Sequence, residues 1–237
     1  ATSGDGQLGV AFTAPTDNGG NPILSFTATC GDQSASGPAS PIVVPGLVNG
    51  VTVTCTVTAT NVAGTGPPSV ASASVAPRKV TSVSVASSSN PSTSGMTITF
   101  TATITGQSPG GLVVFKDGGV TMASGCSGAS VIAGQASCFI SSLSTGPHDI
   151  TGEYSGDAAN APSTSPVFFQ TVIAAGFTLR AGPAGDGSGL IRNGRVTSSP
   201  AGIDCGPTTS NCQASFASGQ QVTLTATPEA GYQFAFW

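Results

Sequence analysis

Six cysteines are the residues of this sequence whose type and spacing most clearly favour a chemistry. They fall along the chain as three close pairs, without the CxxC spacing and the additional histidines that a zinc site uses. An even number of such cysteines predicts disulfides, and disulfides predict an oxidising, extracytoplasmic location. If one pair closes within each of three independently folding domains, the bridges are Cys30–Cys55, Cys126–Cys138 and Cys205–Cys212.

Few other residues could support catalysis. The chain has one histidine, His148, beside Asp149, and only 10 Asp and Glu residues in 237. This His-Asp pair could belong to a hydrolase triad, but the Gly-x-Ser-x-Gly turn of such enzymes does not accompany it. A structural role for His148 is favoured. We therefore predict no catalytic residues, no metal site, no cofactor and no enzymatic activity.

Two further chemistries are weaker alternatives. Asp157 with Asn160, or Asp186 within AGDGSG, could donate oxygens to calcium, although calcium usually takes 6–8 oxygens and several carboxylates. A plain turn aspartate is the favoured interpretation at both positions. Lys79 or Lys116 could form an isopeptide bond with an asparagine near a carboxylate, which the disulfides would make redundant.

The end of the sequence carries alternating aromatic residues, namely Tyr232, Phe234 and Phe236, with Trp237 on the opposite parity. Alternate aromatic residues on one face are typical of the core of a small sandwich. We therefore expect them to pack inward. Exposure would instead make them a candidate strip for stacking against sugars.

Charge excludes one large class of partner. Charged residues are 7% of the chain and the net charge is −4, with Arg78-Lys79 as the only dibasic pair. Nucleic-acid binding needs a basic surface, so we predict no nucleic-acid partner.

Hydrophobic runs are broken within a few positions by Thr, Ser or Gly, so we predict no membrane insertion. Residues 1–12 show no signal-peptide pattern.

Apolar residues alternate with polar ones throughout, as in half-buried antiparallel strands. Turn sequences such as Asp17-Asn18-Gly19-Gly20 and Asn49-Gly50 lie between the alternating segments. The pattern predicts an all-β chain of tandem β-sandwich domains followed by a small C-terminal β domain, arranged as a semi-rigid string. The expected strands cover residues 8–15, 23–30, 51–60, 97–106, 112–119, 148–154 and 221–228.

Two joints divide the chain. At Val75-Ala76-Pro77 an expected strand runs into a proline, which cannot continue a sheet ladder. The motif vocabulary changes again after residues 172–176. We therefore predict domains at 1–77, 78–173 and 174–237, the last of which could be truncated.

Residues 1–77 resemble a bacterial fibronectin type III domain. The resemblance rests on Asn18-Gly19-Gly20, on PGLVNG at 45–50 and on ATNVAGTG at 59–66. Phe12 stands where the family has its core tryptophan, and Val53 stands at the position of its tyrosine corner. The family's first strand is largely missing. Parity places Cys30 and Cys55 on inward faces, so we expect a buried disulfide.

The two later segments also resemble bacterial modules. Residues 80–172, with SSSNPSTSGMTITFTATITG, GLVVFKDGG and EYSGD, resemble a bacterial Ig-like repeat, in which His148, Ile150 and Tyr154 share one face. Residues 176–237 resemble a small bacterial β-repeat of secreted surface proteins. That repeat typically ends in Gly-Trp-Ser-Gly, whereas this sequence ends in AFW.

These resemblances imply a non-catalytic structural or adhesive segment, a stalk or spacer, of a bacterial extracellular or cell-surface protein. One alternative is a subunit of a self-assembling extracellular filament, in which incomplete ends let one copy complete the next. Another is a set of accessory modules of a secreted polysaccharide-degrading enzyme. The expected partners are other domains of the same protein or copies of itself, with surface glycans and host or matrix proteins as further candidates.

Overall fold

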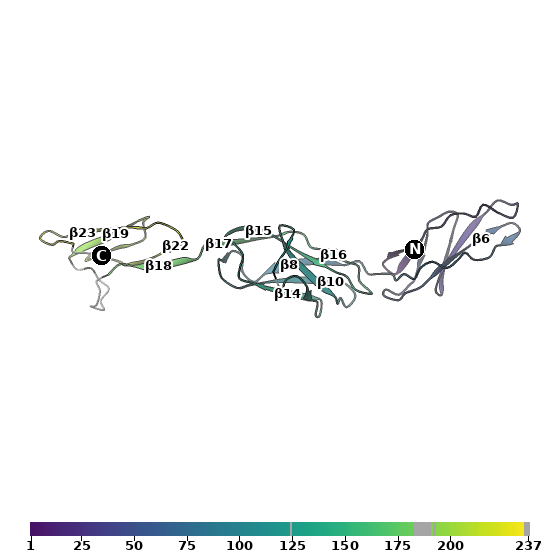
Figure 1. Ribbon diagram of the computed structural model, residues 1–237, viewed down its shortest axis with the longest axis horizontal. Helices are drawn as coiled ribbons and strands as arrows, with labels where there is room; N and C mark the ends of the chain where they lie inside the picture. Colours follow the sequence, from purple (N-terminus) through teal and green to yellow (C-terminus); the bar gives the residue numbers. More distant parts are fainter. Residues whose placement is uncertain (124, 183–190, 192, 235–237) are drawn as a thin grey trace. The chain divides into compact units, whose positions relative to one another are not determined.

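A computed structural model of the chain describes residues 1–237 except 124, 183–190, 192 and 235–237. Within the described residues the regular structure consists of strands, and no helix occurs. Figure 1 shows these strands in separate sheets along the chain, which confirms the all-β tandem sandwich. No helix in the described part is long and apolar enough to cross a membrane.

The first sandwich has two antiparallel sheets with strand orders β1-β2-β5 and β4-β3-β6-β7. Its strands are β1 (Thr2–Gly4), β2 (Gln7–Val10), β3 (Ser25–Cys30), β4 (Gln33–Gly37), β5 (Ile42–Pro45), β6 (Cys55–Asn61) and β7 (Gly64–Thr65). Only a short strand of three residues, β1, occupies the edge beside β2, where Thr2 pairs with Gly9.

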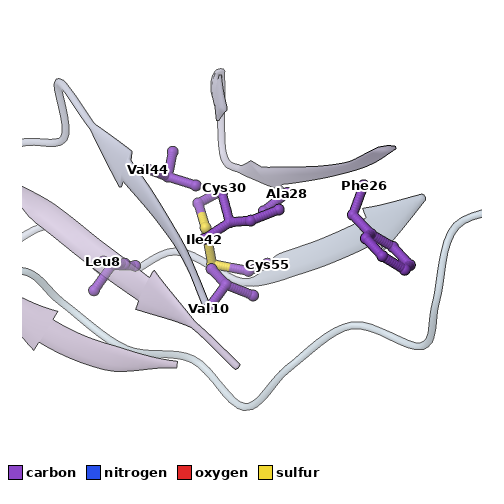
Figure 2. Packing of buried hydrophobic residues seen from close by; sticks show 8 residues of the cluster. All are labelled: Leu8, Val10, Phe26, Ala28, Cys30, Ile42, Val44 and Cys55. Atoms are coloured by element: carbon purple, nitrogen blue, oxygen red, sulfur yellow. A yellow bond between two sulfur atoms is a disulfide. The ribbon is translucent and has the colours of Figure 1, made fainter. Parts of the chain in front are cut away.

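The core of the first sandwich follows from alternation. In β3, Phe26, Ala28 and Cys30 are buried while the threonines between them face outward. Inward side chains from both sheets meet there, as Figure 2 shows. This core is built mainly from aliphatic residues and the two cysteines: Leu8, Val10, Phe26, Ala28, Cys30, Ile42, Val44 and Cys55.

Two of the strands expected in this domain are shorter than their patterns. The segment expected as a strand over 8–15 leaves the sheet after Val10, and Phe12 donates its N–H to Ser40 Oγ at 2.9 Å. Its ring still packs against Phe26, with centroids 4.8 Å apart. The segment expected over 51–60 begins its ladder only at Cys55, because Val53 forms an isolated bridge with Val75.

A segment that the alternation did not reveal covers the outer side of β6. Residues 66–75 donate a backbone hydrogen bond at every third residue: Gly66, Ser69 and Ser72 to β6, and Val75 to Val53 just before it. The hydroxyls of Ser69 and Ser72 also accept the N–H groups of Val57 and Cys55, at 3.1 and 3.0 Å. Pro67 and Pro68, which lie within this run, have no N–H to donate, and a period of three replaces the period of two.

The second sandwich pairs a three-stranded sheet, β14-β10-β8, with a larger sheet, β12-β11-β15-β17-β9, in which β13 adds to β11 and β16 to β15. Its strands are β8 (Ser82–Ser87), β9 (Ser92–Thr93), β10 (Ile98–Thr105), β11 (Leu112–Asp117), β12 (Val120–Thr121), β13 (Ala129–Ser130), β14 (Gln135–Ile140), β15 (Gly146–Tyr154), β16 (Ser163–Thr164) and β17 (Phe168–Ile173). Its core contains two fully buried phenylalanines, Phe100 and Phe115, and the buried Ile150 and Tyr154.

The third set of strands forms a two-stranded sheet, β18-β22, and a four-stranded sheet, β21-β20-β19-β23. They are β18 (Gly176–Arg180), β19 (Gly194–Ser199), β20 (Asp204–Gly206), β21 (Thr209–Asn211), β22 (Gln213–Ala217) and β23 (Thr223–Pro228). The fully buried part of this core is small: Ala181, Val196, Ile203, Cys205 and Phe216.

One expectation fails in this region. Tyr232 and Phe234 are 55% and 45% exposed and lie outside the strands, so the predicted inward packing of these aromatics is wrong. The alternation lies in an irregular segment after β23, where side-chain parity does not decide which side faces the core. Phe236 and Trp237 lie outside the described residues.

The residues group into two compact units, which are 1–90 with 97–141 and 147–171, and 91–96 with 142–146 and 172–237. Near the first predicted joint, Pro77 is fully buried and its carbonyl accepts the N–H of Gly50 at 2.9 Å. Two residues later, Lys79 exchanges backbone hydrogen bonds with Ala159 and Ala161. The chain thus passes from the first set of strands to the second over residues 77–79. The boundaries 77/78 and 173/174 stay predictions.

Serine and threonine hydroxyl groups make the outward faces of the sheets polar in a chain with few charged residues. On outward faces, Thr27 Oγ1 lies 2.8 Å from Ser36 Oγ, and Ser82 Oγ lies 2.6 Å from Thr105 Oγ1. Such cross-strand pairs each contribute a few tenths of a kcal/mol to about 1 kcal/mol. The frequent Ser and Thr residues thus serve sheet pairing as well as solubility.

Candidate functional site

The first disulfide joins directly paired positions on neighbouring strands of one sheet. Cys30 on β3 pairs with Cys55 on β6, and their Cα atoms lie 4.2 Å apart. The bridge is visible in Figure 2 among aliphatic side chains of the opposite sheet. Cys30 is 0% and Cys55 2% exposed, so both sulfurs point into the core, as the parity of their strands predicted.

The second disulfide connects the two sheets of its sandwich. Cys138 lies on β14, in the three-stranded sheet. Cys126 lies beside β11 of the larger sheet, where its carbonyl accepts the N–H of Phe115 at 2.8 Å. Both cysteines are buried, and their Cα atoms lie 4.8 Å apart. The turn between them, with Ala133 and Gly134 at positive φ, carries the chain from one sheet to the other.

The third disulfide has a similar position in the last set of strands. Cys205 lies on β20 of the four-stranded sheet. Cys212 immediately precedes β22 of the two-stranded sheet, and its carbonyl accepts the N–H of Ala181 at 2.9 Å. The loop predicted between them is the β20–β21 hairpin. Cys205 is fully buried, whereas Cys212 is only partly buried.

The histidine pairs with an aspartate, but not with its sequence neighbour Asp149. His148 Nδ1 lies 2.7 Å from Asp117 Oδ2, and the histidine side chain is only 9% exposed. Asp117 ends β11 and His148 lies near the start of β15, so the contact joins two strands of one sheet. The inward parity of His148, Ile150 and Tyr154 is as predicted. This geometry gives the pair a strand-linking role.

Asp157 is the centre of a hydrogen-bonded anchor. Its Oδ1 accepts the N–H groups of Ala159 and Asn160, both at 2.8 Å, and its Oδ2 accepts Gly110 N–H at 2.8 Å and Tyr154 O–H at 3.0 Å. The Asn160 amide donates to both carboxylate oxygens, at 3.0 and 2.9 Å. Both oxygens therefore face hydrogen-bond donors, which is the environment of a loop anchor and not of a calcium ligand.

The electrostatics of this anchor agree with its geometry. Burial alone would raise the pKa of Asp157, but the hydrogen bonds from Gly110, Asn160, Ala159 and Tyr154 outweigh burial and lower the pKa to about 2. Burial, together with the bond to Asp157, raises the pKa of Tyr154 to about 12. The ionised carboxylate and the neutral phenol are thus both stabilised by the fold.

The lysines considered for isopeptide chemistry form ion pairs. Lys79 Nζ lies 2.8 Å from Asp5 Oδ2, and Asn49 Nδ2 donates to Asp5 Oδ1 at 2.9 Å. These hydrogen bonds from Lys79 and Asn49 lower the pKa of Asp5. The Lys79 and Asp5 side chains are 46% and 38% exposed, whereas amide formation requires groups shielded from water in uncharged form. Lys116 pairs with Glu153 at 2.6 Å.

Other predicted candidates can be placed only in part. Asp186, the second calcium candidate, lies outside the described residues. Among the residues that the structure describes, no group of three or more His, Cys, Asp and Glu side chains could hold a metal ion.

An open groove of about 520 Å³ lies at one end of the first sandwich, between the loop before β3 and the β6–β7 hairpin. Asn61 fastens the two walls, since its Nδ2 donates to Asn18 O at 2.7 Å and its Oδ1 accepts Ala63 N–H at 2.9 Å. Gly19 and Gly20, at positive φ, shape the facing loop. Two of the three motifs that suggested fibronectin type III, Asn18-Gly19-Gly20 and residues 59–66, therefore meet at this point.

Comparison with known proteins gives two family matches. Residues 83–173 match the model of the bacterial Ig-like domain (group 3), and residues 193–237 match the divergent InlB B-repeat domain. The first match begins three residues after the start predicted from the motifs and ends one residue after their end. No curated protein matches the chain.

Solved structures of similar fold include fibronectin and Ig-like arrays. The fibronectin(III)-like modules of Clostridium thermocellum CbhA are 16% identical, with a TM-score of 0.33, and the match covers 72% of this chain and 90% of that chain. A putative membrane anchored protein from Corynebacterium diphtheriae is 14% identical, with a TM-score of 0.31 and coverages of 81% and 52%. Titin domains I67–I69 are 15% identical, with a TM-score of 0.33 and coverages of 95% and 71%.

The two family matches confirm the resemblances drawn for the second and third segments. The middle of the chain is similar to bacterial Ig-like domains of group 3, and its last segment is similar to divergent InlB B-repeats.

Proposed function

We propose that this chain is a non-catalytic structural segment, a stalk or spacer, of a bacterial extracellular or cell-surface protein. The observation that carries the proposal is the presence of one disulfide in each of the three successive sets of sheets. Disulfides of this kind persist in oxidising compartments and stabilise small domains whose cores are limited. The matches to bacterial Ig-like and InlB B-repeat modules support the same assignment.

The engaged carboxylates also support a structural role. Asp157 is satisfied by donors of its own loop, Asp117 pairs with His148, and Asp5 pairs with Lys79. A catalytic carboxylate would instead need access to substrate and a pKa matched to proton transfer. Here the best-defined shift lowers the pKa of Asp157 to about 2, which keeps the group ionised and fixed at neutral pH.

The partners under this proposal are neighbouring domains of the same protein or further copies of it, with surface glycans and host or matrix proteins as binding targets of an adhesive variant. A glycan and matrix-protein array probed with the purified chain separates the two variants. Specific binding supports adhesion, whereas the absence of binding limits the role to that of a spacer. Turnover of ester, peptide or glycoside substrates by the chain would contradict the proposal.

The spacer role can be tested on a bacterial surface. On a bacterium that carries a polysaccharide layer, the chain is placed between a membrane anchor and an epitope. Antibody binding to the epitope is measured before and after protease treatment. We expect the oxidised chain to keep the epitope accessible and attached. A control of equal length with all six cysteines changed to serine should lose the epitope to protease. Equal loss of the epitope from the oxidised chain and from the cysteine-to-serine control would contradict a spacer fastened by disulfides.

A further inference from the structure

We propose that this chain extends in two stages under tension. The sheets open first, and the loops closed by the disulfides extend only when a thiol reductant is present. This inference rests on the proposed stalk or spacer function, because it concerns tension applied between the two ends of the chain. It follows from where each bridge lies in the sequence and from how deeply its sulfurs are buried.

In the first sandwich, tension transmitted along the covalent chain passes from residue 30 directly to residue 55 through the sulfurs. The residues between them include β4 and β5, with the buried Ile42 and Val44. Pulling on the ends therefore separates β2 from β5, the segment 66–75 from β6, and β3 from β6 as far as the bridge, while the covalent chain through β4 and β5 carries no tension. The first stage of extension leaves this loop closed.

The same bypass operates in the other two bridges, with loops of different size. The sequence separations are 25, 12 and 7 residues for the first, second and third bridges. An extended chain spans about 3.3–3.6 Å per residue, so opening the loops releases about 80, 40 and 20 Å. The three lengths differ enough for each event to be assigned to its own disulfide.

Burial controls when a reductant can act. Both sulfurs of the first two bridges belong to residues that are 0–2% exposed, so a thiolate reaches them only after the surrounding sheets have separated. Cys212 of the third bridge is only partly buried, so this bridge is accessible earlier. The second stage is thus gated first by mechanical opening and then by chemistry.

The chemical step is thiol-disulfide exchange with an external dithiol. A thiolate of the dithiol attacks one cysteine sulfur, the S–S bond breaks, and its electron pair leaves on the other cysteine as a thiolate. The second thiol of the reagent, as its thiolate, then attacks the reagent sulfur of the mixed disulfide, the cysteine leaves as a second thiolate, and the reagent closes into a cyclic disulfide. The reagent is oxidised and the protein disulfide is reduced, so the loop becomes free to extend.

The test is force-clamp spectroscopy of the full chain held by its two ends, with and without dithiothreitol. Without the dithiol we expect unfolding steps that exclude the disulfide loops. With it, further steps of about 80, 40 and 20 Å should follow each domain's unfolding. The Cys30→Ala/Cys55→Ala variant is the matched control: the 80 Å segment should join the first unfolding step, with or without dithiol.

Two results would overturn the inference. One is an initial step in oxidised wild-type protein as long as that of the double variant. The other is a dithiol-dependent 80 Å step that precedes unfolding of the first sandwich. If the steps appear as expected but the surface-display experiment fails, the spacer function is wrong and the extension behaviour stands. If display succeeds without these steps, the reverse holds.

Discussion

The first two sandwiches both contain few charged and aromatic residues, and their sheets are stabilised in different ways. In the first, the disulfide joins two strands that are already hydrogen-bonded, and mainly aliphatic side chains, with Phe26, fill the core between the sheets. In the second, the disulfide joins the sheets, Phe100 and Phe115 fill the space between them, and Asp157 anchors a loop. The comparison teaches that the first bridge acts mainly on the unfolded chain, whereas the second also restrains the native packing.

The largest effect is expected from removing the first bridge. In the chain-entropy model, closing a loop with a sequence separation of 25 residues stabilises the folded state by about 3.5 kcal/mol. The Cys30→Ala/Cys55→Ala variant should lose stability by about that amount. Urea titration read by hydrogen exchange of peptides from residues 1–77 measures it. Because the β3–β6 ladder persists, amides of the first sandwich that exchange by local opening should change little, whereas core amides that exchange through global unfolding should accelerate in proportion to the lost stability. An unchanged urea transition would contradict this account.

The Cys126→Ala/Cys138→Ala variant sharpens the comparison. Its loop is shorter, with a separation of 12 residues, so the entropic loss is about 3 kcal/mol. Here we also expect amides of β14 that exchange by local opening to exchange faster, because the covalent link between the sheets is gone. Acceleration confined to the amides that exchange through global unfolding would mean that this bridge, like the first, acts only through the unfolded chain.

The Asp157 anchor should make the second sandwich sensitive to acid. The pKa of Asp157 is lowered to about 2 in the folded chain, below its ordinary value of 3.8. Its contribution is therefore fully present above about pH 4 and is lost as the pH falls through about 2. Asp157→Asn should cost about 1–2 kcal/mol at pH 7, after allowance for partial exposure, and the difference from wild type should shrink toward pH 2.

The control for this prediction is Tyr154→Phe, which removes one donor to Asp157 and leaves the others in place. The pKa of Tyr154 is raised to about 12, so its contribution is present below about pH 10 and is lost as the pH rises through 12. Wild type and Tyr154→Phe should therefore converge at alkaline pH in urea titrations. A pH-independent penalty for Asp157→Asn between pH 2 and 6 would refute the anchor.

The smallest effect is expected from the exposed ion pairs. Lys116 and Glu153 are 25% and 42% exposed, and such pairs contribute between 0 and about 1 kcal/mol. Lys116→Ala should change the free energy of unfolding of the second sandwich by less than about 0.5 kcal/mol at physiological salt. A loss as large as that of Asp157→Asn would show that surface charge contributes more to this sheet than the buried anchor does.

The sequence predicted the sheets better than it predicted their edges. Alternation located β3, β10, β11 and β23 to within a few residues because one face of each strand is buried or, in β23, half-buried. It failed over residues 66–75, where prolines and serines impose a period of three, and after β23, where the backbone is irregular. Neither feature leaves a period-two signal.

In the candidate site too, features set by local periodicity could be predicted, whereas contacts between residues far apart in the sequence could not. The inward parity of Cys30 and Cys55 could be predicted because it depends on strand periodicity alone. The partner of His148 could not, because Asp117 approaches from a strand 31 residues earlier in the chain. Likewise, the donor Gly110 lies 47 residues from Asp157, so the spacing of Tyr154, Asp157 and Asn160 indicated a turn but not an anchor.

Each of the three successive sets of strands is closed by its own local disulfide. Peptide mapping by mass spectrometry of protein purified without reductant, with free thiols blocked by alkylation, tests it most directly. The account predicts no alkylated cysteine and three linked peptide pairs that join Cys30 to Cys55, Cys126 to Cys138 and Cys205 to Cys212. Alkylated cysteines, or a peptide pair that links cysteines of different domains, would contradict it.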